Sequence, residues 1–309
     1  MVGIARTAVL TALIVSGAPM RAQTTVDTVP EWQKAAGDKM SFEVASIKLA
    51  DPGGKYIPAN FPWDITDALS FSGTGSPHGH MVGQGTIAGS SAGYVEFAFK
   101  VWPSGEIRDA MLARVGKWVT ADQYVINAQA QGDPTKDQMR LMMQSLLADR
   151  FKLTVHFERR GTQVIALVLE KPGKTGAKLN PHSNDPPCDV AKVTSDLFVL
   201  PCGVVQLADR PNNTIVMSGR NLTVDQIAWY LTLFPRDFGN GHPVVDQTGL
   251  VGRFDFSIQW TRRTNDPVTL EPGTTMQEAL QDQLGLKLKS TRAFVDTLII
   301  DHIERPTEN

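Results

Sequence analysis

The chain has 309 residues, of which 42% are hydrophobic and 20% are charged, and its formal net charge is -2. This length and composition suit one large or two ordinary globular domains, and they exclude a disordered, collagen-like, coiled-coil or polytopic membrane protein. Because 30 Lys and Arg balance 32 Asp and Glu and form no long basic run, we expect no nucleic-acid partner.

The first segment, residues 1–22, has the pattern of a secretory signal peptide. Arg6 precedes an apolar stretch that is too short to cross a bilayer core of about 30 Å as a helix. We therefore expect cleavage after Ala22, a periplasmic or extracellular location, and no membrane span in the mature chain. Met20 and Arg21 are unusual before a cleavage site, so retention of the segment as an uncleaved anchor stays open.

The next segments are irregular apart from two short strands. Residues 23–41 are polar and without a clear period, which predicts a flexible leader. The alternation in residues 42–48, FEVASIK, predicts a strand. Residues 70–93 are rich in Gly and Ser, which predicts loops and a thin strand near residues 86–88.

Three helix starts share one pattern, the capping box. Thr135, Thr223 and Thr275 are each followed three residues later by Gln or Glu. In this arrangement the Thr hydroxyl accepts a hydrogen bond from a free backbone N–H, and the Gln or Glu side chain reaches back to the N–H of the Thr. Apolar residues of helical period follow each box, so we predict three helices that pack one face on a core.

Strands with apolar residues at every second position surround these helices. The predicted strands are residues 122–130, 149–158 and 162–171 in the first half and residues 252–260, 285–290 and 293–304 in the second half. Further upstream, residues 85–102 and 213–231 resemble each other as a short strand, a polar turn and a short helix. Both halves therefore have the order strand, helix, strand, helix, strand, strand, and we infer an internal duplication.

This order predicts an α+β fold of two related modules, in which helices pack on mainly antiparallel sheets. The N-terminal module, with an added strand and loops, would cover residues 42–172, and the C-terminal module residues 212–305, before a tail at residues 306–309. A linker rich in Pro and Asn, residues 173–211, would join them. Two separate modules and one continuous sheet, paired edge to edge, both stay open, because each half alone leaves an unpaired strand edge.

Both cysteines of the chain, Cys188 and Cys202, lie in this linker. In an exported protein they predict a disulfide, since the compartment is oxidising. A redox-active or metal-binding pair is the alternative, but the two residues lack the close CxxC spacing that lowers a thiol pKa.

Several long motifs of the chain are shared with one known family. The strings are FEVASIK, DQMRLMMQSLLADRFKLTVHFERR, PVVDQTGLVGRFDFSIQW, LQDQLGLKLKS and LIIDHIERPTEN. They resemble the "Soli" paralogous family, secreted bacterial proteins of unknown function, over nearly the whole mature chain. The resemblance is weaker between Tyr94 and Val119. It implies export, a shared fold and many paralogues without an established activity.

Two further similarities concern relatives and fold. Some relatives of the Soli family are similar to the extracellular portion of membrane sensor-peptidase proteins, which implies a sensing or binding role. The order of elements is also faintly similar to the short N-terminal domain of secretins and TonB-dependent receptors, which binds other envelope proteins. That similarity concerns the fold alone, and a fold does not determine a function.

The sequence holds no complete catalytic motif. A GxSxG elbow, a phosphate-binding loop, a dinucleotide-binding loop and an HExxH pair are all missing, so we expect no catalytic residue and no cofactor. Ser76 lies near His78 and His80, but no strand-to-helix turn is predicted to hold its hydroxyl. The HxH pair could begin a metal site, yet two ligands are too few and solvated histidines are the commoner case. A third ligand would come from Asp64, Asp67 or His242.

The segment from Pro243 to Arg253 concentrates turn residues and charge. Asp246 and Arg253 are candidates for lining a ligand pocket. In the structural interpretation, which we favour, Asp246 caps a turn while Gly249 and Gly252 supply backbone conformations with positive φ.

Export and duplication without a catalytic set favour a binding protein over an enzyme. We expect a non-enzymatic module that binds an envelope or secreted protein through exposed strand edges or through the cleft between the modules. The alternative is a secreted hydrolase, metal-assisted through His78, His80 and an acidic residue. The oligomeric state is left open.

Overall fold

The computed structural model describes most of the chain after the predicted signal segment. The described ranges are residues 29–67, 77–90, 93–101, 104–185, 188, 193–194, 197–198, 202–233, 242–261 and 273–306. Residues 1–22 and Ser76 lie outside them. Part of the expected leader is helical, because α1 (Glu31–Ala36) packs beside α5 (Lys136–Phe151). Ser145 of α5 donates a hydrogen bond to the carbonyl of Met40, 2.6 Å away.

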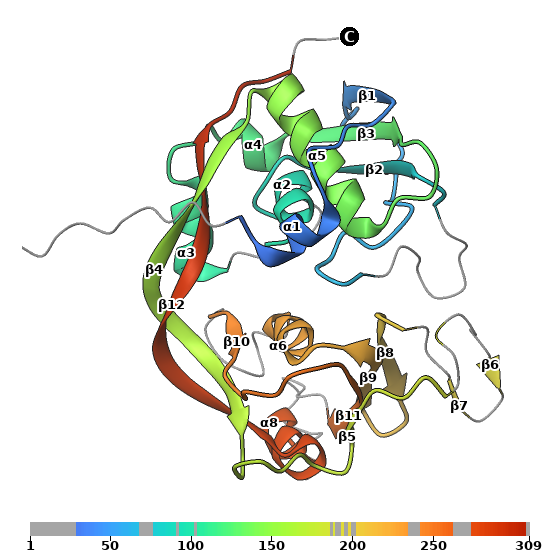
Figure 1. Cartoon of the computed structure of the whole chain (residues 1–309), viewed down its shortest axis with the longest axis vertical. Helices are drawn as coiled ribbons and strands as arrows, with labels where there is room; N and C mark the ends of the chain where they lie inside the picture. The colour runs from blue at the N-terminus through green and yellow to red at the C-terminus, as the bar shows by residue number, and fades with distance from the viewer. Residues whose placement is uncertain are drawn as a thin grey trace, which may run out of the picture.

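The first module is a three-stranded antiparallel sheet, in the order β1-β3-β2, covered by helices (Figure 1). Its core joins Tyr94 and Phe97 of α2, Met139 and Leu147 of α5, and Ile126 of β3. Alternate burial along β3 places every second side chain in this core. Its elements besides α1 and α5 are β1 (Val44–Leu49), β2 (His80–Thr86), α2 (Tyr94–Phe99), α3 (Gly105–Leu112), α4 (Trp118–Ala121) and β3 (Gln123–Gln129).

The second module repeats this plan with a four-stranded antiparallel sheet, in the order β5-β11-β9-β8. Trp260 of β11, Ile227 of α6 and Leu280 of η1 meet in its core. Its elements are β5 (Leu179–Pro181), β8 (Val205–Arg210), β9 (Thr214–Leu222), α6 (Val224–Thr232), β11 (Phe254–Thr261), α8 (Met276–Ala279) and η1 (Leu280–Leu284). The short strands β6 (Val193–Thr194) and β7 (Leu197–Phe198) pair with each other in a separate sheet.

The expected linker, residues 173–211, is part of this second sheet. It supplies both outer strands, β5 and β8, which pair with β11 and β9. The sequence prediction of a linker missed them because β5 is short and β8 carries polar residues on an edge, where burial imposes no clear alternation. The predicted α+β fold with mainly antiparallel sheets is confirmed. The predicted order of elements is only partly matched, because α3 and α4 were not expected between α2 and β3.

All three predicted capping boxes are present. In each box the Thr hydroxyl accepts a hydrogen bond, 3.2 Å long, from the backbone N–H three residues later. The Gln or Glu side chain at that later position accepts a hydrogen bond from the backbone N–H of the Thr. The three residues are Thr135, Thr223 and Thr275. The helix that follows Thr135, α5, runs to Phe151 and so includes the start of the strand predicted at residues 149–158. It ends where Lys152 adopts a left-handed conformation, φ 53°.

One long two-stranded ribbon runs along a side of the molecule and joins the two modules (Figure 1). It consists of β4 (Thr154–Leu169) and β12 (Leu286–His302), which pair antiparallel along their length, and β10 (Val244–Asp246) adds a parallel strand to β4. The sequence predicted two strands in place of each long one. This was wrong, because the pairing continues without a turn through the Gly161 and Phe294 positions.

The ribbon exchanges its ends between the two cores. β4 begins with Val155 packed against the first core and ends with Leu167 in the second core. β12 runs the opposite way, from Leu286 in the second core to Leu298 and Ile300 in the first. The halves therefore join through their last strands, while the sheets β1-β3-β2 and β5-β11-β9-β8 stay separate. No helix in the described part of the chain is long and apolar enough to cross a membrane.

The predicted disulfide between Cys188 and Cys202 is present, with the two Cα atoms 4.9 Å apart. Replacing both cysteines by Ser should lower the free energy of unfolding by about 3 kcal/mol, since the unfolded chain loses a constraint on a short loop. Secondary structure should persist, because neither cysteine belongs to the two cores. Thermal unfolding and far-ultraviolet circular dichroism of the double variant test this, and loss of all secondary structure would contradict it.

Candidate functional site between the modules

A cavity of about 430 Å³ lies between the two modules. The first module lines it with Asp67, Lys100 and Asp137, and the second module with Asp225 and Arg253. A second cavity of about 260 Å³ adjoins the first and shares Lys100 and Asp225 with it. A concave site between modules, lined by charged groups of both, is a usual location for a small ligand.

Lys100 stands at the centre of this wall. It ends α2 in a left-handed conformation, φ 55°, and its side chain is 16% exposed. Its Nζ lies 3.2 Å from Oδ1 of Asp67 and 3.3 Å from Oδ1 of Asp137, and 5.7 Å from the ring centroid of Trp32. Burial tends to raise the pKa of the Asp67 carboxyl, but Lys100 and Arg253 outweigh burial and lower it.

Two polar contacts cross from one module to the other. Arg253, just before β11, places Nη2 3.0 Å from Oδ2 of Asp67, and its Nη1 donates to the carbonyl of Asn221 at 2.8 Å. Tyr230 of α6 donates its hydroxyl to Oδ2 of Asp64 at 3.0 Å. These contacts hold the two sides of the cavity against each other.

A buried layer of charge supports the first-module side. Lys136 places Nζ 2.5 Å from Oδ1 of Asp64, and its side chain is 1% exposed. Burial lowers the pKa of the Lys136 ammonium to about 8, although Asp64 opposes this. Arg140, one turn further along α5, pairs with Asp137 and donates to the carbonyls of Asp64 and Thr66. The charged groups therefore position the segment that carries Asp64 and Asp67.

Asp225 differs from the other acids of the cavity. It lies in the first turn of α6, is exposed to the cavity, and no hydrogen bond or ion pair of its carboxylate is found within the described ranges. Partial desolvation within the cavity and the charge of Asp246 raise its pKa, and Lys100 opposes them. The cavity therefore offers an acidic group whose charged form a cationic ligand would stabilise.

A buried acid outside the cavity, Glu96 of α2, predicts a pH-dependent stability. Glu96 is 3% exposed, and burial raises its pKa to about 7 against the hydrogen bond from the N–H of Gly89. The folded state therefore holds the proton more tightly than the unfolded state, so the free energy of unfolding falls as pH rises from 4.5 to about 7. This group should contribute a loss of about 3 kcal/mol across that window.

Glu96→Gln should remove that loss. Denaturant unfolding at both ends of the window is the measurement. The variant should match the wild type at the acidic end and be more stable at neutral pH. Equal stabilities of the two proteins at neutral pH would contradict a buried carboxylate there.

The candidate pocket residues from the sequence take different places. Arg253 lines the cavity. Asp246 caps a turn, since its Oδ1 accepts from the backbone N–H and the hydroxyl of Thr248 at 2.8 and 2.7 Å. Gly249 and Gly252 have φ of 71° and 110°, the positive values that the structural interpretation of this segment expects.

The HxH pair is not brought together as one set of ligands. His78 lies in the turn before β2, where Nδ1 contacts Oδ1 of Asp133 at 2.8 Å. His80, in β2, contacts Oδ1 of Asn127 through Nε2 at 3.0 Å. Asp64 and Asp67, two candidates for a third ligand, are engaged with cations in the cavity wall.

Sequence analysis missed the two central residues of the site, Lys100 and Asp225. Lys100 follows an apolar helix, and Asp225 occupies a helix first turn, where an acid is expected for local reasons. The sequence did hold a signal for Lys136 and Arg140, because two charged residues four positions apart fall on one side of the predicted helix. In the structure this side of α5 faces the core, and both residues are buried.

Comparison with known proteins adds a family. A model described as a protein of unknown function, DUF3738, matches residues 93–303, which is more than half of the chain. No curated protein and no solved structure matches the chain. The resemblance to the Soli family and the similarity to the secretin module stay predictions. The chain belongs to the DUF3738 family of proteins of unknown function.

Proposed function

We propose that this chain is a binding protein that holds a small, amine-bearing molecule in the cavity between its two modules. The observation that supports the proposal is the cavity of about 430 Å³ with charged groups from both modules in its wall. A volume of this size fits a small polar molecule such as an amino acid, an amino sugar or a short peptide end.

The chemistry of the ligand follows from the charges in the wall. The ammonium group would pair with Asp225, because desolvation and the charge of Asp246 disfavour its charged form and raise its pKa. Arg253 donates through Nη1 to the carbonyl of Asn221 and through Nη2 to Asp67. A guanidinium carries five N–H donors, so others are left for an oxygen of the ligand. Trp32 supplies an apolar wall next to Lys100.

Calorimetric titration of small amines and their N-acetylated counterparts tests this function. The amine should bind and the acetylated form should bind at least about tenfold more weakly, since the ion pair with Asp225 is lost. Asp225→Asn should weaken binding to a similar extent. Asp282→Asn, at an exposed position in η1, is the matched control and should leave the affinity unchanged. Equal binding of amines and acetylated forms would contradict the proposal.

A second candidate function is protein binding at an outer strand, as the sequence analysis expected for an envelope or secreted partner. β1 is an outer strand of its sheet, and Val44 and Leu49 on it are 68% and 63% exposed. An extended partner segment could add to such an edge through backbone hydrogen bonds. Protection of residues 44–49 from hydrogen exchange upon addition of a partner would support this mode.

Fewer observations bear on the cellular location of the chain and on the alternative function, a metal-assisted hydrolase. The disulfide supports export to an oxidising compartment, as the signal pattern predicts. The metal-assisted hydrolase has less support, because His78 and His80 are each engaged by a different neighbour.

A further inference from the structure

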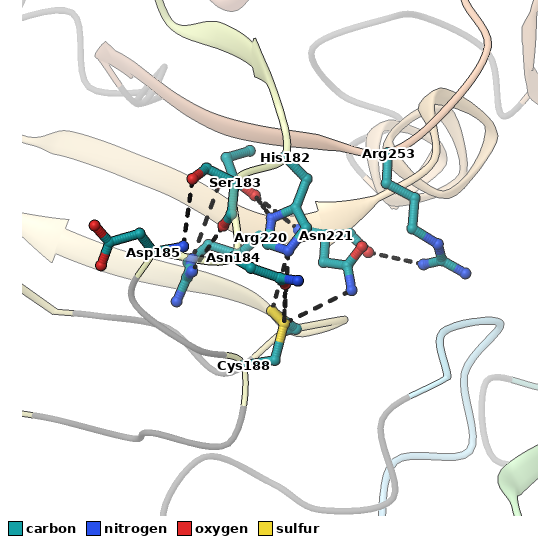
Figure 2. Close-up of a disulfide and its surroundings, with 10 residues drawn as sticks. His182, Ser183, Asn184, Asp185, Cys188, Arg220, Asn221 and Arg253 are labelled. Atoms are coloured by element: carbon teal, nitrogen blue, oxygen red, sulfur yellow. Dashed lines mark hydrogen bonds and ion pairs between the residues drawn. A yellow bond between two sulfur atoms is a disulfide. The ribbon is translucent and has the colours of Figure 1, made fainter.

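His182 lies directly beside the disulfide (Figure 2). Its Nε2 is 3.6 Å from Sγ of Cys188 and 3.8 Å from Sγ of Cys202, and its side chain is 12% exposed. Within the part of the chain that the structure describes, this is the single group of three potential metal ligands whose atoms all lie within 4.8 Å of one another.

A carboxylate orients the imidazole. Nδ1 of His182 lies 2.7 Å from Oδ1 of Asp255, and the backbone N–H of Asn221 donates to the same oxygen at 2.9 Å. Because Asp255 accepts the Nδ1 proton, the lone pair of Nε2 points toward the two sulfur atoms. The same arrangement of carboxylate and histidine positions the imidazole in metal sites.

The backbone is shaped to hold this carboxylate. Phe254 and Phe256 of β11 pair with Leu222 and Gly219 of β9, so two residues of β9 stand opposite Asp255 alone. In this β-bulge Asn221 has a left-handed conformation, φ 56°, which directs its N–H to the Asp255 carboxylate. Bulges of this kind commonly occur where a side chain must be aimed at a functional site.

We propose that reduction of the disulfide converts this cluster into a binding site for one Zn²⁺, with the thiolates of Cys188 and Cys202 and Nε2 of His182 as ligands. Tetrahedral zinc with Zn–S of about 2.3 Å and Zn–N of about 2.0 Å places nitrogen and sulfur about 3.5 Å apart. The observed distances are 3.6 and 3.8 Å, so the histidine already stands in place. The sulfur atoms must separate to about 3.8 Å, and water takes the fourth position.

The reduction balances with a dithiol as the reductant. Its two S–H bonds break and its own disulfide forms, while the bond between Cys188 and Cys202 breaks and each sulfur receives one electron and one proton. Zn²⁺ then displaces both thiol protons into solvent. The metal therefore binds the reduced form alone, and the site distinguishes the two redox states of the chain.

Titration with Co²⁺, a spectroscopic probe for zinc sites, tests the proposal. The full chain is reduced with a phosphine, desalted without oxygen and titrated, in parallel with the oxidised chain. The reduced chain should show a thiolate-to-cobalt absorption band that saturates at one equivalent and disappears with Zn²⁺. The oxidised chain should show no such band. Absence of the band in both forms would overturn the proposal.

Three variants separate the site from general metal binding. His182→Gln should weaken Co²⁺ binding at least about tenfold, and Asp255→Asn by about 10- to 100-fold. His302→Gln is the matched control, because His302 also contacts a carboxylate, Glu304, at 2.8 Å on the surface, and it should bind as the wild type does. Equal affinity of the His182 variant and the wild type would overturn the proposal. If the reduced chain unfolds, Zn²⁺ should restore its circular dichroism, and failure to do so would count against the site.

Discussion

Replacing Lys136 by Met should lower the free energy of unfolding by about 3 kcal/mol or more. The variant leaves the carboxylate of Asp64 in a largely buried position without its ammonium partner, and removal of one member of a buried ion pair typically costs about 3–5 kcal/mol. Asp64 keeps the hydrogen bond from Tyr230, and its side chain is 19% exposed, which places the expected loss at the lower end. Denaturant unfolding at neutral pH is the measurement.

Two further variants test whether the loss of stability comes from the unpaired carboxylate of Asp64. Lys34→Met removes an exposed lysine that pairs with Glu31 at 2.7 Å, and it should change the stability by less than about 0.5 kcal/mol. The double variant with Asp64→Asn and Lys136→Met should be more stable than Lys136→Met alone, because no unpaired charge stays buried. A loss below about 1 kcal/mol for Lys136→Met would mean that solvent reaches Asp64.

Replacing Ile300 by Ala should destabilise the first module, although Ile300 comes near the end of the second half of the sequence. Ile300 and Leu298 are 0% and 2% exposed and belong to the first core. A large-to-small substitution at such a site costs about 2–5 kcal/mol through lost burial and a residual cavity. Hydrogen exchange should increase in α5 and β3, which face this core.

The matched control lies on the same strand. Phe294→Ala removes a larger side chain that is 64% exposed, so it should cost less than about 1 kcal/mol, including its contact with Arg159. Since β4 and β12 both enter the two cores, heat unfolding of the wild type should proceed in one cooperative transition. Two separated transitions, or increased exchange in the second module alone for Ile300→Ala, would contradict the shared ribbon.

Local signals predicted most helices and several strands. The boxes at Thr135, Thr223 and Thr275 depend on residues three positions apart, and alternation along β3 and β11 depends on residues two positions apart. Such patterns are visible in a single chain because the interacting groups are near neighbours in sequence. The sequence did not predict where α5 ends, because the helix stops at the left-handed conformation of Lys152, and no residue pattern marks that position.

The residues of the candidate sites are far apart in the sequence, so local patterns did not predict that they would meet. Asp67 and Arg253 are far apart in the chain and meet across the cavity at 3.0 Å. Asp255 lies in β11, His182 directly follows β5, and both cysteines lie between β5 and β8, so no spacing in the sequence connects the four residues. The sequence analysis assigned His182 no role.

The sequence alone determined the α+β class, the three capped helices and the pairing of the two cysteines. These features depend on local backbone preferences, on hydrophobic period and on having just two cysteines to pair. The tertiary structure decided the exchange of β4 and β12 between the cores, the charged cavity and the position of His182. Those features arise where segments distant in the chain are packed together to bury apolar surface, and only that packing specifies which polar groups become neighbours.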